Sequence, residues 1–573
     1  MAGVAEMQGL TGFSPSELVS FRPQRLALHE LLIRVTADLA VPDGSRIGDL
    51  GINFREIAGR VNQRYLIPEM DAIVAVYERA RTELRDAIDA ALAEIMPDES
   101  AAGAPPERSR ASWLFSSMTR RRTTGAASEV PARGWGPDHI AECGRLADLA
   151  QDPRHKITYR TLGRVLSALF ATQGRAWGTR EIILSIATDM ACNEYAGDCI
   201  GGTIEPLLLL AAQGEGYKLL PRQERPIVIN TKGPSASGKS TLRPLQKQLA
   251  GDIGAQWGDF ALISPDIWRK QLLDYAALGA AYKYAGAFTA EELQIVDQKL
   301  DRYMACKHRR GSMTHLLIDR FRFDSFAPDS DEAGSNLLTR FGHTVHLFFV
   351  ITPPELLVER AWMRGLEFGR YKAVDDTLAH AVEAYAGIPD VFFTWIRRSD
   401  KRIRFEFLDN SVPFGERPRT VAFGDNSTVN ILDVKRMLDI IRYGRVFVDA
   451  TGPDSLYLDR ALLAAEHNLS FLRRCVEAFS RVNFVDQASG RIYLRMEYGV
   501  AVSVDPLALQ EAVRESDTKA GIGAVAPDAL GGDAAAFARP LGLKLEHGAA
   551  NDGSGAMPTL GVWGYSGQPR ESQ

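Results

Sequence analysis

Residues 233–240, GPSASGKS, decide the fold of the central part of this chain. They follow the apolar run PIVINT, which begins at Pro226, and they precede TLRPLQKQLA, which begins at Thr241. A strand, a glycine-rich loop and a helix in this order match the pattern G-x-x-x-x-G-K-[ST], in which backbone N–H groups surround phosphate. The sequence therefore predicts a nucleotide-phosphate site, and the context disfavours the alternative of a glycine-rich turn without a ligand.

Lys239 and Ser240 carry the charged and metal-binding functions of this loop. The Lys239 ammonium is placed to reach the terminal phosphates, and the Ser240 hydroxyl is an oxygen ligand of the kind that Mg²⁺ takes beside phosphates. ATP and Mg²⁺ are therefore the expected cofactors. The residues expected to bind the nucleotide are Gly233, Pro234, Ser235, Ala236, Ser237, Gly238, Lys239, Ser240 and Thr241.

Short β-rich runs alternate with helical segments over residues 225–449. This alternation predicts an α/β fold of the P-loop NTPase type, a parallel sheet flanked by helices, whose ligands bind at the carboxyl ends of the strands. The runs after PIVINT are FALIS at 260–264, HLLID at 315–319, TVHLFFVIT at 344–352 and IRFEFL at 403–408.

Two carboxylates follow predicted strands at this edge of the sheet. Asp266 comes after FALISP, where it can either accept the proton of an acceptor hydroxyl or cap the helix that follows; the residues alone leave both roles open. Asp319 ends HLLID, the position of a carboxylate that holds Mg²⁺ directly or through water, with substrate binding and an ordinary surface aspartate as alternatives. We expect Ser240 and Asp319 to form the metal site.

Three arginines lie in or after one predicted helix within PPELLVERAWMRGLEFGRYK, residues 353–372. Arg360 and Arg364 are four residues apart and share a helix face, and Arg370 follows the helix. Arginines on a mobile lid would neutralise phosphate charge and exclude water during transfer. Spacing alone also fits an exposed basic face.

The rest of the chain divides by composition and periodicity. Apolar residues recur at helical spacing over 69–96, whereas the Ala, Gly, Pro, Ser and Arg that follow predict a disordered linker. The predicted segments are a helical N-terminal region at 1–96, the linker at 97–137, a helical region at 138–224, the kinase-type domain at 225–449, a helix and β-hairpin appendage at 450–513, and a disordered tail at 514–573.

The composition is that of an ordinary soluble protein: 573 residues, 45% hydrophobic, with a formal net charge of -5. The net acidity weighs against a nucleic-acid partner, although it leaves room for a local basic groove. Five scattered cysteines without metal-ligand spacing fit a reduced, cytoplasmic compartment. The N-terminus lacks a signal-peptide pattern and the longest apolar run, at 206–212, is too short for a bilayer, so we expect no membrane association.

The order GPSASGKS, SPDIWR, LLID, VERAWMRGLEFGR and FEFLDNS resembles the zeta-toxin-like kinases, a P-loop group related to polynucleotide kinases. The resemblance covers residues 225–449. It implies that Asp266 is the base that activates an acceptor hydroxyl, and that lid arginines, either Arg364 and Arg370 or Arg360 and Arg364, contact the phosphates of ATP. It also implies a small-molecule or nucleotide acceptor of the nucleotide-sugar or NAD type, and suggests an antitoxin-like protein partner.

Two classes of function follow. The first is an ATP- and Mg²⁺-dependent kinase that phosphorylates a hydroxyl of a small molecule or nucleotide, with a polynucleotide 5′-hydroxyl kinase as the alternative within the enzyme class. The second is a non-catalytic ATP-binding regulatory protein. Asp266 discriminates between the classes, because only a kinase needs that carboxylate.

Overall fold

The computed structural model describes residues 2–46, 48–96, 135–320, 338–368, 371–413, 415–531, 544–545 and 557–563. These residues form two compact units. The helical unit comprises Met1–Leu31 and Asn62–Leu209, and the sheet unit comprises Leu32–Val61 and Leu210–Gln573. The predicted linker, apart from residues 135–137, lies outside the described residues.

The helical unit is built from amphipathic helices. The amphipathic helix predicted at 69–96 is confirmed as α5 (Met70–Ile95), which buries Ile73, Tyr77, Leu84 and Ile88 on one stripe. The other helices with residues in this unit are α1 (Ala2–Thr11), α2 (Pro15–Leu18), α3 (Pro23–Asp38), α6 (Pro137–Leu149), α7 (Pro153–Gln173) and α8 (Arg180–Glu215).

Local signals set the ends of α7, and ion pairs join the helices of this unit. The Asp152 side chain accepts from the His155 N–H at the start of α7, and Gly174 ends the helix with a φ of 69°. Arg81 on α5 donates to Asp189 on α8 at 2.8 Å. In the part of the chain that the structure describes, no helix combines the length and apolar character needed to cross a bilayer.

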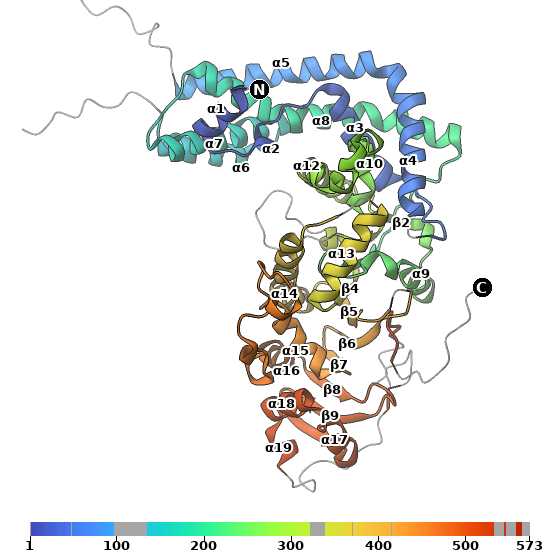
Figure 1. Cartoon of the computed structure of the whole chain (residues 1–573). Helices are drawn as coiled ribbons and strands as arrows, with labels where there is room; N and C mark the ends of the chain where they lie inside the picture. The colour runs from blue at the N-terminus through green and yellow to red at the C-terminus, as the bar shows by residue number, and fades with distance from the viewer. Residues whose placement is uncertain are drawn as a thin grey trace, which may run out of the picture. The chain divides into compact units, whose positions relative to one another are not determined.

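The sheet unit contains one ten-stranded sheet among the described residues, in the order β10-β9-β8-β7-β6-β5-β4-β1-β3-β2 (Figure 1). Its strands are β1 (Ile227–Lys232), β2 (Phe260–Ile263), β3 (His315–Ile318), β4 (Thr344–Ile351), β5 (Arg402–Asp409), β6 (Arg419–Asp425), β7 (Thr428–Ile431), β8 (Arg481–Val485), β9 (Ile492–Glu497) and β10 (Val500–Val504).

The parallel sheet predicted from the sequence occupies one side of this larger mixed sheet. Strands β2, β3, β1, β4 and β5 pair in parallel, and so do β7 and β8, whereas β5–β6, β6–β7, β8–β9 and β9–β10 pair antiparallel. The expectation of a parallel sheet is therefore corrected to a mixed α/β sheet. The cause is local at β6 and β7: the Asp425 carboxylate accepts from the N–H groups of Ser427 and Thr428 and closes a tight turn between them.

The helices of the sheet unit pack on this sheet around an aromatic core. Phe392 lies 4.7 Å from Phe405 and 5.0 Å from Phe407 between ring centroids, so it fixes α14 against β5. The helices are α4 (Asp49–Val61), α9 (Arg243–Asp252), α10 (Arg269–Leu272), α11 (Ala285–Phe288), α12 (Ala290–Arg309), α13 (Pro354–Phe368), α14 (Val374–Ile396), α15 (Val434–Tyr443), α16 (Ser470–Ala478), α17 (Pro506–Ala512), α18 (Ser516–Val525) and α19 (Pro527–Leu530).

Residues 32–61 belong to the sheet unit, although the sequence grouped them with the helical N-terminal region. Trp268 is fully buried, and its indole N–H donates to Thr36 Oγ1 at 3.0 Å. Lys307, also buried, donates to the carbonyl of Ala37 at 2.9 Å and pairs with Asp38. These buried polar groups depend on residues 32–61 for their partners.

Helical structure also extends beyond residue 514, where the composition predicted a disordered tail. The Glu515 side chain accepts from the Thr518 N–H at 2.6 Å and caps α18. A Cβ on Gly521 would meet Val434 Cγ1 at 2.6 Å, so this glycine permits close helix packing against α15. Glycine enrichment here serves packing, which composition alone cannot distinguish from disorder.

Candidate functional site

The predicted phosphate loop lies between β1 and the helical segment that precedes α9. In the sheet, β1 is flanked by β3 and β4, so the loop stands where the strand order reverses direction, the position at which open α/β sheets bind ligands. The chain after the loop begins as a 3₁₀ turn, Lys239–Leu242, before α9 starts. Pro244 explains this turn, because it has no N–H to donate to the Ser240 carbonyl.

The loop backbone is held in a left-handed conformation at two positions. Gly238 has a φ of 91°, and a Cβ there would meet Asn410 Nδ2 at 2.3 Å. Ala236 has a φ of 64°, which strains a residue that carries a Cβ. Asn410, at the end of β5, donates to the Ser237 carbonyl at 2.6 Å and so fastens the loop from the neighbouring strand ends.

Lys239 folds back onto its own loop. Its ammonium donates to the Gly233 carbonyl at 3.0 Å and to the Pro234 carbonyl at 2.9 Å. The side chain therefore spans the loop that the sequence assigns to phosphate, with its charge on the concave backbone.

Ser240 and Asp319, the predicted metal ligands, lie together. The Ser240 hydroxyl donates to Asp319 Oδ2 at 2.8 Å, although the two residues are far apart in the chain. Asp319 follows β3, and β3 pairs in parallel with β1, so the strand register brings the carboxylate to the loop. One hydroxyl and one carboxylate fit Mg²⁺, which keeps water and phosphate oxygens as its remaining ligands.

Asp266 lies at the end of β2, on the same edge of the sheet. Its side chain is 40% exposed and accepts from Arg269 Nε at 2.7 Å. Arg269 also donates to the Gly286 carbonyl and to Thr289 Oγ1. The carboxylate is thus accessible, and Arg269 ties it to the segment between β2 and β3.

The lid arginines occupy different surroundings. Arg364 on α13 donates to Ser235 Oγ in the loop at 3.2 Å. Arg360, one turn earlier, donates to the carbonyls of Asn410 and Val412 at 2.9 and 3.0 Å, so its guanidinium supports the end of β5. Of the two, Arg364 is the one in contact with the loop, and Arg370 lies outside the described residues.

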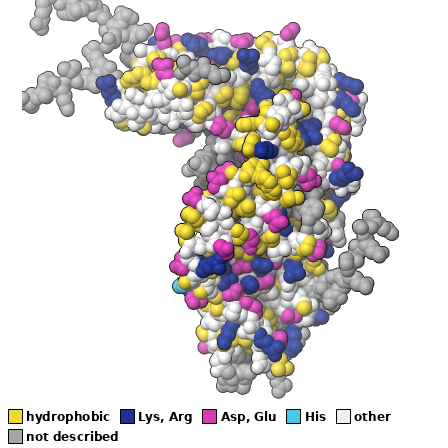
Figure 2. All heavy atoms as spheres, viewed as in Figure 1, with side chains coloured by type: hydrophobic (Ala, Val, Ile, Leu, Met, Phe, Trp, Pro, Cys, Tyr) yellow, Lys and Arg dark blue, Asp and Glu magenta, His cyan; other side chains and the backbone are white. Residues whose placement is uncertain are grey.

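Aromatic side chains surround the lid. The N–H of Tyr371 donates to the Lys283 carbonyl, and its ring lies 5.7 Å from Trp362 and 6.3 Å from Tyr284. Trp362, Met363 and Leu366 on α13 are each more than half exposed. Figure 2 shows hydrophobic side chains gathered on this face, over the region of α10 to α13 in Figure 1.

Two basic groups near the loop were not identified from the sequence. Lys372 follows α13, and its ammonium contacts His380 Nδ1 on α14. Burial, with a smaller contribution from Arg364 and Lys239, lowers the pKa of Lys372 to about 7. Burial and the neighbouring Lys372 lower the pKa of His380 to about 3. A lysine and a histidine eight residues apart form no motif, so this pair could not be found from the sequence.

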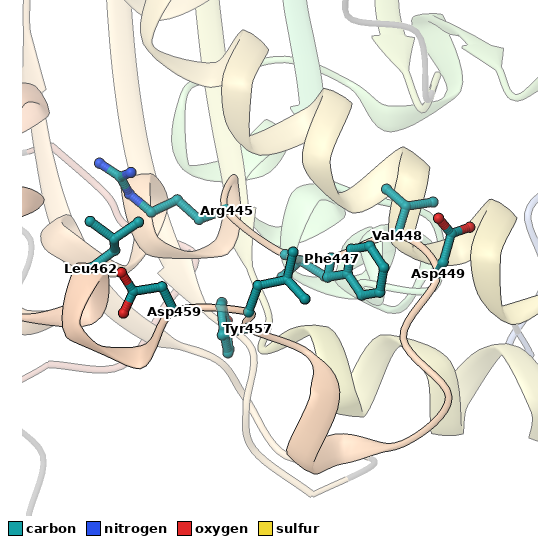
Figure 3. Close-up of a pocket in the computed structure, with 9 residues that line it drawn as sticks. Arg445, Phe447, Val448, Asp449, Tyr457, Asp459 and Leu462 are labelled. Atoms are coloured by element: carbon teal, nitrogen blue, oxygen red, sulfur yellow. The ribbon is translucent and has the colours of Figure 1, made fainter.

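A cavity of 460 Å³ lies away from the loop, beside the segment that follows α15 (Figure 3). None of the residues that the sequence singled out lines it. The N–H of Phe447 donates to the Leu456 carbonyl, which closes the segment around the cavity. The lining residues are Arg445, Val446, Phe447, Val448, Asp449, Tyr457, Leu458, Asp459 and Leu462.

No protein-family model matches this chain, and no curated protein matches it. One solved structure is similar, from the molecular and structural characterisation of the PezAT chromosomal toxin–antitoxin system of the human pathogen Streptococcus pneumoniae. The identity is 17%, the TM-score is 0.24, and the match covers 36% of this chain and 75% of that chain. A likeness this distant assigns no activity, so the function rests on the residues of the site.

Proposed function

We propose that this chain is an ATP-dependent phosphotransferase that acts on a hydroxyl group. The observation that carries this proposal is the contact between Ser240 and Asp319 beside a loop spanned by Lys239. A bound triphosphate and its metal require a lysine, a hydroxyl and a carboxylate close together, and these three residues supply them. Asp266, at the end of β2 on the same edge, adds the carboxylate that a binding protein would not need.

In this proposal Asp266 orients the acceptor hydroxyl and accepts its proton as the new oxygen–phosphorus bond forms. The bond between the γ-phosphorus and the bridging oxygen breaks, and ADP leaves with the electron pair. Arg269 holds the Asp266 carboxylate in place through a 2.7 Å hydrogen bond. Lys239 and Arg364 bind the charge that spreads over the transferring group.

Ser240 and Asp319 would hold Mg²⁺, which supplies charge neutralisation at the phosphate oxygens when bound. The exposed aromatic side chains beside the lid would form one wall of the acceptor site. A small-molecule or nucleotide acceptor suits such a wall, because an aromatic ring can stack on a base or a sugar. An antitoxin-like protein partner remains a prediction from the sequence resemblance.

The decisive experiment incubates the purified full chain with ATP, MgCl₂ and a panel of acceptors, and detects phosphorylated products by mass spectrometry. The panel contains nucleotide sugars, NAD and an oligonucleotide with a free 5′-hydroxyl. We expect one of the small acceptors to gain a phosphoryl group with wild type and none with Lys239→Ala. ATP binding without any product across the panel would favour the regulatory alternative, and a phosphorylated oligonucleotide would favour the polynucleotide kinase.

A further inference from the structure

Lys372 and His380 form a half-buried basic pair close to Lys239 of the phosphate loop. Lys372 lies between α13 and α14, and His380 lies one and a half turns into α14. Their side chains meet through Lys372 Nζ and His380 Nδ1. Because burial holds the imidazole neutral, its ring nitrogen can accept from the lysine and fix the direction of the ammonium.

Charges of both signs surround this pair. Lys239 in the loop and Arg364 on α13 both act on Lys372 electrostatically, and Lys239 acts on His380 as well. Arg364 in turn contacts Ser235 of the loop. The acidic groups that face Lys372, Asp376 and Glu383, both lie on α14.

Gathering Lys239, Arg364 and Lys372 around one loop costs free energy, since like charges raise one another's energy when water is displaced. Asp376 and Glu383 offset part of this cost. A polyanion reverses the sign of that cost. The cluster is therefore arranged for a ligand with several negative charges, and a triphosphate satisfies it.

We propose that Lys372, held by His380, is an additional phosphate-binding residue of this site. The inference rests on the proposed function, because it takes ATP as the ligand. It adds a residue that touches the phosphates and a second, His380, that positions it.

A measurable consequence is proton uptake on binding. In the ligand-free protein the pKa of Lys372 is lowered to about 7, so at pH 8 most molecules carry a neutral amine. Phosphate favours the charged form and raises that pKa in the complex. Binding at pH 8 therefore takes up close to one proton, and affinity falls as pH rises above 7 by up to about tenfold per unit.

The test is isothermal titration calorimetry of the full chain with MgCl₂ and a β–γ imido analogue of ATP. Titrations at pH 6 and pH 8, in buffers with different heats of ionisation, give the number of protons taken up. The variants are Lys372→Met, Lys372→Arg and His380→Asn, and the control is Lys519→Met, an exposed lysine on α18. The ligand's own titration is common to all of them and cancels in the differences.

At pH 8 we expect wild type and the control to take up nearly one proton more than Lys372→Arg or Lys372→Met. Lys372→Arg should keep an affinity that changes less with pH, Lys372→Met should bind about tenfold or more weakly at pH 6, and His380→Asn should weaken binding to a smaller extent. Equal proton uptake in wild type, Lys372→Arg and Lys372→Met would overturn the inference, even with ATP bound normally. Failure of wild type to bind the analogue would overturn the proposed function together with it.

Discussion

Asn410 and Gly238 show how narrowly single residues determine the loop. The Asn410 amide occupies the space that any side chain at position 238 would need, and it holds the Ser237 carbonyl. The glycine-rich loop thus meets a residue that lies about 170 positions later in the chain. At this scale, a misplacement of about 1 Å is enough to impair the chemistry of a site.

Lys239→Ala should abolish phosphotransfer without unfolding the protein. The ammonium donates to carbonyls of a loop outside the core, so its loss removes charge stabilisation of the transferring group while the core stays intact. Product formation and thermal unfolding on the same preparation check both halves. A folded variant with wild-type turnover would contradict the role of Lys239.

Asp266→Asn should reduce phosphotransfer by a factor of about a hundred to ten thousand, the usual contribution of a positioned acid or base. Asparagine keeps the shape and can still accept from Arg269, so ATP binding should persist. Asp274→Asn is the control, because Asp274 is an exposed aspartate nearby whose turn asparagine can also form. Normal transfer by Asp266→Asn would reduce Asp266 to a structural residue.

Among the elements, β5 and the segment 557–563 meet at a buried carboxylate. Glu406 accepts from the N–H groups of Leu560 and Gly561 and from the hydroxyl of Thr420. Burial raises the pKa of Glu406 to about 7, although these three donors act in the opposite direction. The folded protein therefore binds a proton here between pH 4.5 and 7 that the unfolded chain has released.

This linkage predicts that Glu406 costs stability as pH rises from 4.5 to 7, by at most about 3 kcal/mol. Glu406→Gln cannot ionise, so its free energy of unfolding should fall less over that interval. Urea unfolding of both proteins at pH 5 and pH 7.5 gives the difference. Glu497→Gln, a partly exposed glutamate on β9, is the control, and a parallel pH dependence in wild type and Glu406→Gln would contradict the assignment.

Helix α18 supplies a second test at this scale. Asp517 accepts two hydrogen bonds from Arg442 on α15, at 2.7 and 2.8 Å, and both side chains are largely buried. Asp517→Ala should lower the free energy of unfolding by about 3 kcal/mol, because it leaves a buried guanidinium with fewer partners. Glu511→Ala, which removes an exposed pair with Arg514, should cost under about 1 kcal/mol. Equal effects would indicate that α18 does not pack on α15.

The five parallel strands could be predicted from the sequence because each is a run buried on both faces. All but one of the residues of β4 are buried, and such a run is apolar from end to end. Strands β6 and β7 follow β5 with no helix between them, so the alternation of strand and helix that marked the other strands did not separate them from loop. A strand buried on both faces is apolar at nearly every residue, and such a run can be recognised from the sequence alone.

In the candidate site, too, some contacts could be predicted from the sequence and others could not. Ser240 and Asp319 could be placed together in advance, since both follow strands that a parallel sheet brings side by side. Lys372 and His380 could not, because their meeting depends on how the lid returns to the sheet. A contact of that kind is set by tertiary packing and has no spacing that a sequence would display.

At the scale of the whole molecule, each of the two units is built from segments that are not continuous in the sequence. Residues 32–61 are part of the sheet unit, but more than a hundred residues of the helical unit separate them in sequence from β1. The buried donors of Trp268 and Lys307 find their hydrogen-bond acceptors in those N-terminal residues. A cut between the two parts of the sheet unit therefore divides a core.

We predict that residues 135–573 expressed alone are much less stable than the full chain, and that co-expressed residues 1–96 copurify with them. Loss of Asp38 as the partner of Lys307 costs about 3 kcal/mol or more by itself. Denaturant unfolding and a pull-down with a tag on one fragment measure the two effects. A chain that starts at residue 20 keeps residues 32–61 and serves as the control; an equally stable 135–573 fragment would contradict the division.

The Glu406 contact can form only late in the synthesis of the sheet unit. Its amide donors, Leu560 and Gly561, lie 154 and 155 residues downstream. At ordinary elongation rates of about 5–20 residues per second, the ribosome takes on the order of ten to thirty seconds to reach them after β5 emerges. During that interval the Glu406 carboxylate of the nascent sheet lacks both amide donors, so this contact forms well after β5 has been made.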